Sequence, residues 1–478
     1  MYACLVWAVT LLGYAAAMTA QLLAPLVGWD ILTITLVFGG VTLTYTLMSG
    51  LLGAAYNDVP QFFIFFLASF VILYFGIHDF GSYDAIVDNA LTQRPLDFWQ
   101  VVPPSSGTNQ YVDPVTLVAL LFMGLFMAGS PVAGEGWAAQ RFLAAKDERH
   151  AALGQMFNCV LSLAVRMLPI IPLGLLAVAL FPASDPSNPE TLILPDGQTA
   201  PSVEVWARMV RQYAHAAPGF IGLLLAAVLA GYMSTVDTFL QWGSAFVIND
   251  VYRRHIRSDA SQREYLWVAR AVMIVMMILA TCLALSIKDI GVWVIFINAA
   301  MIVPALPLSW LRWFWWRHNV WGEISAILIS FPLAYVVWFV FEFREPLWKP
   351  TAILFGVGLL VSVGFSLLLG PDSRETLRKF YLQVRPPGLW SPIRRELEQQ
   401  RMIDPERLKK EFRWDLLAAA GGIVFCFALT ITMFFATILR WVEVSVLFPV
   451  MLASGSLFYF AWLRSHTLSK DPESPQEM

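Results

Sequence analysis

The chain has 478 residues, of which 58% are apolar and only 14% are charged, whereas about 25% of the residues in a soluble globular protein are charged. A soluble protein of this length has too little interior to cover so many apolar side chains. The composition therefore excludes a cytosolic enzyme, a nucleic-acid binder and a disordered scaffold. Long unbroken apolar runs also exclude an outer-membrane barrel, whose strands alternate polar and apolar residues. An all-α polytopic membrane protein is the class that remains.

The apolar runs set the number of membrane spans. A helix that crosses the hydrocarbon core of a bilayer needs about 20 predominantly apolar residues, and by this rule the sequence predicts about 12 transmembrane helices. The predicted spans cover residues 2–25, 31–52, 59–77, 115–135, 151–181, 217–247, 265–286, 290–312, 320–341, 347–369, 414–438 and 444–463.

Lysine and arginine predict the orientation of these spans. They gather in segments 141–150, 253–263 and 374–413 and around the turn 312–317, all of which fall on one side if the spans alternate. Cytoplasmic loops carry an excess of these residues, so this side is predicted to be cytoplasmic and both termini to lie there. The longer and more acidic intervening loops then face outward. We expect a multi-pass protein of the cell (inner) membrane.

The same patterns predict three parts of the chain. Residues 1–370 form a core of membrane spans, which the resemblance described below implies is a transporter core with an incomplete first repeat, 371–413 a cytoplasmic amphipathic linker with proline breaks, and 414–478 two C-terminal helices with a tail. The excess of Lys and Arg in this linker is explained if it is a solvated loop on the cytoplasmic side. The alternative is that these residues form a site for lipid head groups or for a partner. The sequence has neither a phosphate-cradling loop nor cysteine spacing typical of a metal site, so no cofactor or structural metal is expected.

Ionisable residues inside a span are costly and point to function. In segment 49–61, two glycines allow either a close approach of another helix or a helix break, and Asp58 and Gln61 follow one turn apart at the start of the next predicted helix. A carboxylate at a helix N-terminus is favoured by the helix dipole, so Asp58 is explained either as a cap or as part of an inner gate or cation relay.

A second polar group lies within the predicted span 217–247. Ser234 and Thr235 are adjacent hydroxyls one turn after Gly231. Hard cations bind to hydroxyl and carbonyl oxygens, whereas Ser and Thr in helices often bond back to the preceding turn. Asp237 in the same stretch is harder to explain as purely structural.

Two further parts of the predicted spans, segment 129–137 and Arg166, are candidates for contact with a substrate. Segment 129–137 holds three glycines and a proline beside Glu135 and Trp137, which favours the kind of discontinuous helix that transporters use for substrate binding. Arg166 lies about midway along its span, too deep to reach water easily. Either it pairs with Glu135 or Asp237, or it recognises a carboxylate or hydroxyl of a substrate.

Three motifs together resemble the sodium:solute symporter family, over residues 1–370. They are the glycine-pair segment 49–61, the run Gln-Arg-Phe-Leu-Ala-Ala-Lys at 140–146, and Met-Ser-Thr at 233–235 followed by Asn-Asp-Val-Tyr-Arg-Arg at 249–254. Within the first motif, Ser49 and Asn57 stand where the family usually has Gly and Thr.

The resemblance implies a LeuT-like fold, the five-plus-five inverted repeat with alternating access. It implies sodium as the coupling ion, with ligands from Gly231 (through its carbonyl), Ser234 and Thr235. Its other implied site residues are a candidate second cation site or inner gate at Asp58, Gln61 and Asp237, and a substrate cavity lined by Glu135, Trp137, Arg166, Trp293 and Asn298.

The family has further helices before the position that matches Met1, so the resemblance implies a truncated first repeat, a start upstream of Met1, or lost sodium coupling. The predicted function is secondary active transport, a sodium-coupled symport of a small polar organic solute, and no enzymatic activity. The alternatives are a proton-coupled or sodium-independent permease and a non-transporting membrane sensor or assembly protein. Expected partners are the solute, Na+ and the lipid bilayer, with no nucleic acid.

Overall fold

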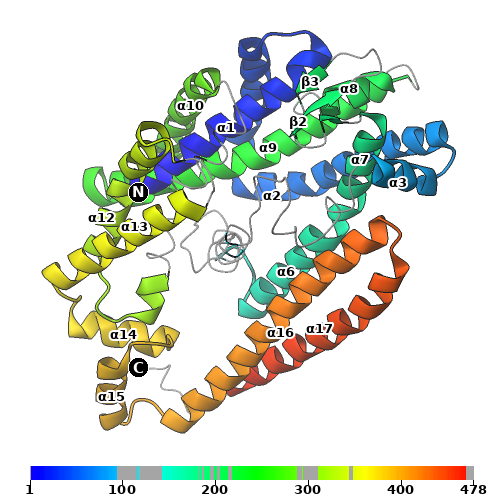
Figure 1. Ribbon diagram of the computed structural model, residues 1–478. Coiled ribbons are helices and arrows are strands. Elements are labelled where there is room, and N and C mark those ends of the chain that lie inside the picture. The colour runs from blue at the N-terminus through cyan, green and yellow to red at the C-terminus, as the bar shows by residue number, and fades with distance from the viewer. Residues whose placement is uncertain are drawn as a thin grey trace. The chain divides into compact units, whose positions relative to one another are not determined.

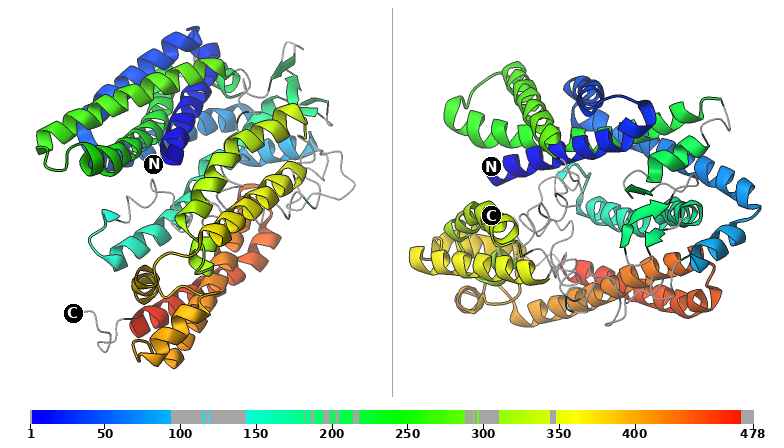
Figure 2. Two further views of the ribbon diagram at one scale, coloured as in Figure 1. Left: turned by 90° about the vertical axis from the view of Figure 1, so that its left-hand side faces the viewer. Right: turned by 45° about the horizontal axis from the view of Figure 1, so that its top comes forward.

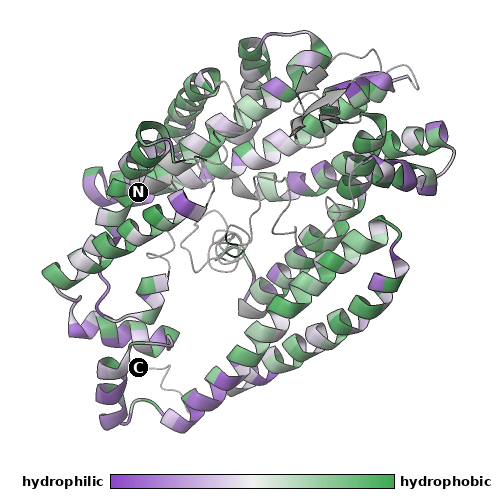
Figure 3. Ribbon diagram, in the orientation of Figure 1, coloured by the Kyte–Doolittle hydropathy of each residue, from purple (hydrophilic) through white to green (hydrophobic). Residues whose placement is uncertain are grey.

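The computed structural model describes residues 2–93, 115, 118, 143–181, 183–185, 188–193, 199–201, 205–213, 218–287, 293, 296, 310–343 and 348–469. Among these residues, ten helices are long and apolar enough to cross a membrane. They match ten of the predicted spans, and the two remaining predictions, 115–135 and 290–312, fall largely outside the described residues. Figure 3 shows the apolar residues running along these helices.

The described helices, in chain order, are α1 (Tyr2–Val27), α2 (Ile31–Phe80), α3 (Tyr83–Thr92), α6 (Glu148–Val160), the π-helical turn η3 (Leu161–Val165), α7 (Met167–Leu180), α8 (Val205–Gln212), α9 (Phe220–Phe246), the π-helix η5 (Val247–Ile256), α10 (Gln262–Ser286), α12 (Val320–Tyr335), the π-helical turn η6 (Val336–Val340), α13 (Trp348–Leu369), α14 (Arg374–Val384), α15 (Ser391–Gln399), α16 (Pro405–Thr437) and α17 (Trp441–Ser469). A small antiparallel sheet in the predicted outward loop adds to this all-α plan. Its order is β1-β2-β3, with β1 (Ala183–Asp185), β2 (Asn188–Ile193) and β3 (Thr199–Pro201).

The chain forms two compact units, one of residues 1–114, 135–145 and 169–301 and the other of residues 115–134, 146–168 and 302–478. In the first unit, α1, α9 and α10 lie side by side (Figures 1 and 2) and α2 packs against α9. Small residues bring these helices close, as is usual for helices in lipid. A Cβ atom added to Gly243 would come within 2.3 Å of the Met276 side chain, and one added to Gly13 within 2.8 Å of Leu283.

The helix α2 contains the break that its glycine pair allows. Gly50 has φ 62° and ψ −172°, a conformation that side chains with a Cβ atom disfavour. The Tyr45 hydroxyl donates a hydrogen bond to the Gly53 carbonyl at 2.9 Å, so one side chain links the two halves of the helix across the break. Asp58 and Gln61 lie on the second half.

In the second unit, α12 and α13 pack closely near one end. Asn319 caps α12 by accepting hydrogen bonds from the backbone N–H groups of Trp321 and Gly322, each at 3.0 Å. A Cβ atom on Gly322 would lie 2.2 Å from the Ser366 hydroxyl of α13, so this contact needs a glycine. His318 is buried beside it, with Nδ1 3.1 Å from that hydroxyl.

The segment between α13 and α16 contains the short helices α14 and α15. The chain leaves α14 just before Pro386 and Pro387, and Pro405 begins α16, as the predicted proline breaks require. Pro392 instead occupies the first turn of α15, where proline is tolerated. The helices α16 and α17 form a close hairpin (Figure 1) in which Gly421 faces the backbone of Phe458. The proposed division at residues 370 and 413 stays a prediction.

The buried imidazole of His318 makes the stability of the second unit depend on pH. Burial, aided by the positive charge of Arg312, lowers the pKa of His318 to about 4, from a usual value of about 6.5. The unfolded chain therefore binds more protons between these two values, and stability falls as the pH falls through this window, by about 3 kcal/mol at most. Thermal unfolding of the full chain in detergent, followed from pH 7 to pH 4, measures this loss.

The variant His318→Gln keeps a polar group beside Ser366 but cannot titrate, so its melting temperature should fall less between pH 6.5 and pH 4. His255→Gln, at an exposed position in η5, is the matched control and should keep the full loss. If the melting temperature of His318→Gln fell with pH as much as that of the wild type, His318 would not be the source of the acid dependence.

Candidate functional site

The predicted sodium ligands share one face of α9. Gly231 and Thr235 are exposed and Ser234 is half-buried, and a Cβ atom added to Gly231 would meet no other atom within 4 Å. The Thr235 hydroxyl donates a hydrogen bond to the Gly231 carbonyl at 3.1 Å. The Thr235 hydroxyl oxygen keeps its lone pairs after this bond, whereas the Gly231 carbonyl lies within α9 and also accepts a helical N–H. The face therefore presents two hydroxyls and a carbonyl, the oxygen types that hard cations bind.

Another face of α9 carries a buried carboxylate. Asp237 is 1% exposed and Gln241, one turn later, is 7% exposed. The Thr238 hydroxyl donates to the Ser234 carbonyl at 2.9 Å and lies 3.3 Å from Asp237 Oδ1. Thr238 thus connects the turn that holds the predicted sodium ligands to the buried carboxylate.

The helix α2, which contains Tyr45, carries a second predicted carboxylate, that of Asp58. Asp58 is half-buried and Gln61 is 7% exposed on the second half of α2. The surroundings of the Tyr45 hydroxyl are dominated by burial and by the Ser49 side chain, and the negative charges of Asp237 and Asp58 add smaller effects there. Since α2 packs along α9, the two carboxylates, one from each helix, belong to the neighbourhood of Tyr45. We call Tyr45, Asp58 and Asp237 the carboxylate cluster.

Buried amides accompany the carboxylate cluster. The Gln61 side-chain oxygen and both polar atoms of the Gln241 amide are buried and make no hydrogen bond within the part of the chain that the structure describes. Buried polar atoms are almost always satisfied by protein, water or a ligand. These amides lie one turn from Asp58 and Asp237 respectively, so the α2–α9 interface offers neutral as well as anionic oxygens to a bound cation or water.

Arg166 follows a local widening of its helix. Its backbone N–H donates to the Leu161 carbonyl at 2.8 Å, which closes the π-helical turn η3. Such turns occur often at functional sites. The arginine is exposed. Of its two predicted partners, Asp237 belongs to the other compact unit and Glu135 lies outside the described residues, so the ion pair stays a prediction.

The other predicted cavity residues divide into two groups. Trp293 is half-buried, packs against the core of the first unit and meets the Phe296 ring edge-on, with centroids 5.8 Å apart. Glu135, Trp137 and Asn298 lie outside the described residues, as does the predicted helix break at 129–137.

Three residues of the site were missed by the sequence predictions: Tyr45, Thr238 and Gln241. A usable signal existed for Gln241, which is a polar residue one turn after Asp237 in an apolar run. Tyr45 carried no comparable signal, because aromatic residues are common in every span of this chain.

Comparison with known proteins decides the family. The model of the sodium:solute symporter family matches residues 2–330, which include all three motifs and both faces of α9. The chain belongs to the sodium:solute symporter family. The matched region ends within α12, so the segment between α13 and α16 and the hairpin of α16 and α17 lie beyond it.

Individual members of the family resemble this chain at low identity. High affinity choline transporter 1 of Mus musculus is 28% identical over 260 residues, covering 53% of this chain and 41% of that protein. The sodium/glucose cotransporter of Vibrio parahaemolyticus is 26% identical over 305 residues, with coverages of 61% and 54%. The human sodium/myo-inositol cotransporter is 23% identical over 407 residues, with coverages of 76% and 55%. The chain spans about half the length of these curated relatives.

A solved structure confirms the fold. A Na+-coupled sialic acid symporter in a substrate-bound outward-open state superimposes with a TM-score of 0.57 at 19% identity, covering 78% of this chain and 74% of that one. This likeness confirms the prediction of an all-α polytopic protein with the LeuT-like inverted-repeat architecture.

The carboxylate cluster predicts a response to the removal of one charge. Two carboxylates that share a partly buried neighbourhood repel each other when no cation is present. Asp237→Asn should therefore raise the melting temperature in sodium-free buffer by roughly 2 °C, for about 1 kcal/mol of relieved repulsion. It should also reduce any stabilisation by added sodium chloride relative to choline chloride. Scanning fluorimetry in detergent measures both effects.

The control is Asp250→Asn, which removes the same charge at an exposed position in η5. It should change neither value. A melting temperature for Asp237→Asn that drops in sodium-free buffer would show that this carboxylate is a structural hydrogen-bonding group rather than a source of repulsion.

Proposed function

We propose that this chain is part or all of a secondary active transporter that couples the entry of sodium to the uptake of a small polar organic solute. The observation that carries the proposal is the open face of α9, where Gly231, Ser234 and Thr235 present a carbonyl and two hydroxyls within the region that the family model matches. Members of the family are transporters, and no catalysed chemistry is proposed.

The carboxylate cluster is proposed as a second cation site or inner gate. Asp58 and Asp237 provide negative charge, and Gln61 provides a neutral oxygen one turn away. The sialic acid symporter that resembles this chain is described as having a novel Na+ site, which supports the assignment of more than one cation position. A carboxylate in such a place can also carry a proton, which is how a proton-coupled permease would use Asp237.

The names of the relatives support the proposed substrate class. Choline, glucose, myo-inositol and sialic acid, which appear in the names of similar proteins, are all small, polar and organic. Glu135, Trp137, Trp293 and Asn298 are proposed to line the cavity for such a solute. Arg166 is proposed to bind a carboxylate or hydroxyl of it, because a guanidinium donates several hydrogen bonds in a fixed plane.

Transport follows from differential binding to two states. Sodium on α9 would favour the outward-open state, the solute would then close the site, and movement of one helix bundle against the other would release both inward. In this scheme the protein lies in the cell (inner) membrane, with both termini and the cationic segments on the cytoplasmic side.

Removal of the hydroxyls from α9 tests the sodium site. Ser234→Ala with Thr235→Ala should raise the sodium concentration needed for half-maximal uptake about tenfold or abolish uptake, because two of the proposed oxygen ligands are lost. Uptake of labelled choline, glucose, myo-inositol and sialic acid into proteoliposomes, with an inward sodium gradient, is the measurement.

Thr44→Ala is the matched control, because the exposed Thr44 hydroxyl bonds to the Gly40 carbonyl just as Thr235 bonds to Gly231. It should leave the sodium dependence unchanged. Wild-type uptake that ignores sodium but follows a pH gradient would replace the proposal with a proton-coupled permease. Absence of flux for every solute would favour a non-transporting sensor or assembly protein.

Replacement of Arg166 tests the proposed solute contact. Arg166→Met should abolish uptake while membrane insertion and expression stay normal, because the exposed side chain is not part of a packed core. Arg166→Lys, which keeps the charge but loses the planar donor set, should retain partial uptake with weaker apparent affinity. Unchanged uptake by Arg166→Met would remove Arg166 from the site.

A further inference from the structure

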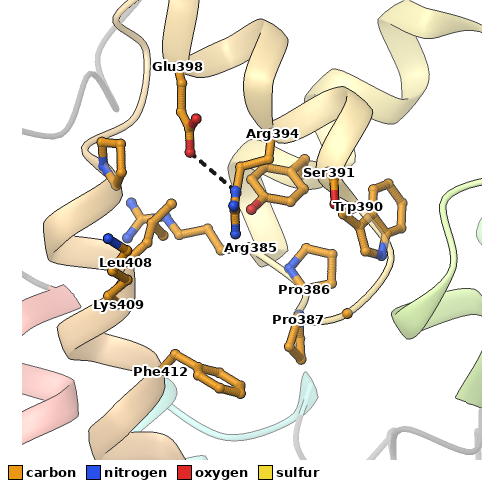
Figure 4. A pocket seen from close by; sticks show the side chains of 13 residues that line it. Arg385, Pro386, Pro387, Trp390, Ser391, Arg394, Glu398, Leu408, Lys409 and Phe412 are labelled. Atoms are coloured by element: carbon orange, nitrogen blue, oxygen red, sulfur yellow. Dashed lines mark ion pairs between the residues drawn. The ribbon is translucent and has the colours of Figure 1, made fainter.

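A partly open cavity lies between the short helices α14 and α15 and the start of α16. The transport proposal does not use it. The cavity volume is about 180 Å³, well above the roughly 10–15 Å³ that a cavity needs, on this measure, to hold one water. The walls come from the end of α14, the turn before α15, α15 itself and the first turns of α16 (Figure 4). The whole cavity lies within the second compact unit.

The wall of the cavity is held in place by an anchored tryptophan. Trp390 is 3% exposed, and its indole N–H donates to the Trp313 carbonyl at 2.6 Å. The next residue back, Leu389, donates its backbone N–H to the Phe314 carbonyl, also at 2.6 Å. Gly388 has φ 95°, and a Cβ atom there would lie 2.8 Å from that same carbonyl. The turn before α15 is therefore fixed without any ligand, so the cavity is preformed.

The charge lining the cavity is predominantly positive. Arg385, Arg394 and Lys409 line it together with a single carboxylate, that of Glu398. Figure 4 shows the three cationic side chains above Phe412 and Pro387. The surrounding segment 374–413 holds 11 Lys and Arg residues against 6 Asp and Glu, in a chain whose net charge is −3. Each of the three cations also pairs with a carboxylate, so an anion would be attracted by the excess of cations in the segment and by the donors that these pairs leave available.

Both arginines keep donors available after their internal ion pairs. Arg385 uses Nη1 to meet both oxygens of Glu411, at 3.1 Å each, and Arg394 uses Nε to meet Glu398 at 3.1 Å. A guanidinium has five N–H donors in one plane, so the remaining ones can bind the oxygens of a phosphate group. Lys409, although 2.7 Å from Glu406, is 64% exposed and adds a third positive charge.

The opposite part of the cavity is apolar and continues along a membrane helix. Leu408 and Phe412 line it one turn apart, and Leu416 follows one turn later on the same face of α16. Phe412 is 49% exposed and Leu416 is 59% exposed. A free inorganic anion gains nothing from this surface, whereas an acyl chain attached to an anionic head group would cover it.

The position of the cavity fits such a ligand. It lies between α13 and α16, both of which are long and apolar enough to span the membrane, so it sits at a membrane surface. We propose that this cavity binds the phosphate-bearing head group of an anionic phospholipid, with an acyl chain along Phe412 and Leu416. The proposal is independent of transport, because none of these residues belongs to the sites on α2 and α9.

The test is lipid binding to the full chain in detergent. Native mass spectrometry counts bound lipid while the protein is titrated with phosphatidylglycerol, with phosphatidylcholine of the same chain length, or with inorganic phosphate. The double variant Arg394→Gln with Lys409→Gln removes two cations of the cavity. The matched control, Lys379→Gln with Arg395→Gln, removes two exposed cations of the same segment that do not line it.

The cavity variant should bind the first phosphatidylglycerol at least tenfold more weakly, because each cation near an anionic lipid adds appreciably to binding. The control should lose less than twofold. Phe412→Ser should weaken phosphatidylglycerol binding with no effect on phosphate. Melting temperatures of all variants within a few degrees of wild type show that the fold is kept.

Three results would overturn the proposal. Equal losses in the cavity variant and the control would mean that the whole segment attracts anions without a site. Equal binding of phosphatidylcholine and phosphatidylglycerol would remove the role of negative charge. Phosphate binding as tight as that of phosphatidylglycerol, with no effect of Phe412→Ser, would make the ligand a free anion.

Discussion

The hydrocarbon core of the bilayer offers no water to a backbone amide or carbonyl, so each must find its partner inside the protein. The described spans nevertheless contain departures from regular helix, namely the break at Gly50 and the π-helical stretches η3, η5 and η6, and for two of them the structure shows which hydrogen bond replaces the regular one. At Gly50 the Tyr45 hydroxyl bonds to the Gly53 carbonyl, and at the π-helical turn η3 the Arg166 N–H reaches Leu161. Both departures lie beside residues that are proposed to act in transport.

The absence of water in the bilayer core also constrains polar side chains, which need a partner inside the protein. The spans of the first unit are joined by small residues such as Gly13 and Gly243, which let apolar side chains interlock. Among these apolar side chains the burial of the Asp237 carboxylate, which is 1% exposed, is energetically unfavourable, and such buried ionisable groups in spans usually have a function. The helices α2 and α9 pack together and carry one carboxylate each, Asp58 and Asp237. A cation bound between them would offset the repulsion between the two charges.

Positive charge is organised differently. It is abundant between α13 and the first turns of α16. There, Arg385, Arg394 and Lys409 line one cavity. For the carboxylate cluster we propose a cation within the membrane, and for this cavity an anionic head group at the membrane surface.

The sequence by itself determined the class, the number and positions of the described spans and the family, because apolar run length and short motifs act locally along the chain. For the glycine pair it allowed a close approach or a break, and the structure shows the break at Gly50. It also placed Asp58 and Asp237 on separate helices without relating them to each other. Only the tertiary structure decided that both carboxylates interact with Tyr45, and that Arg385, Arg394 and Lys409 converge on one cavity with Phe412. The physical reason is that these encounters depend on how helices distant in sequence pack together, and side-chain packing between helices leaves no periodic signal in either one.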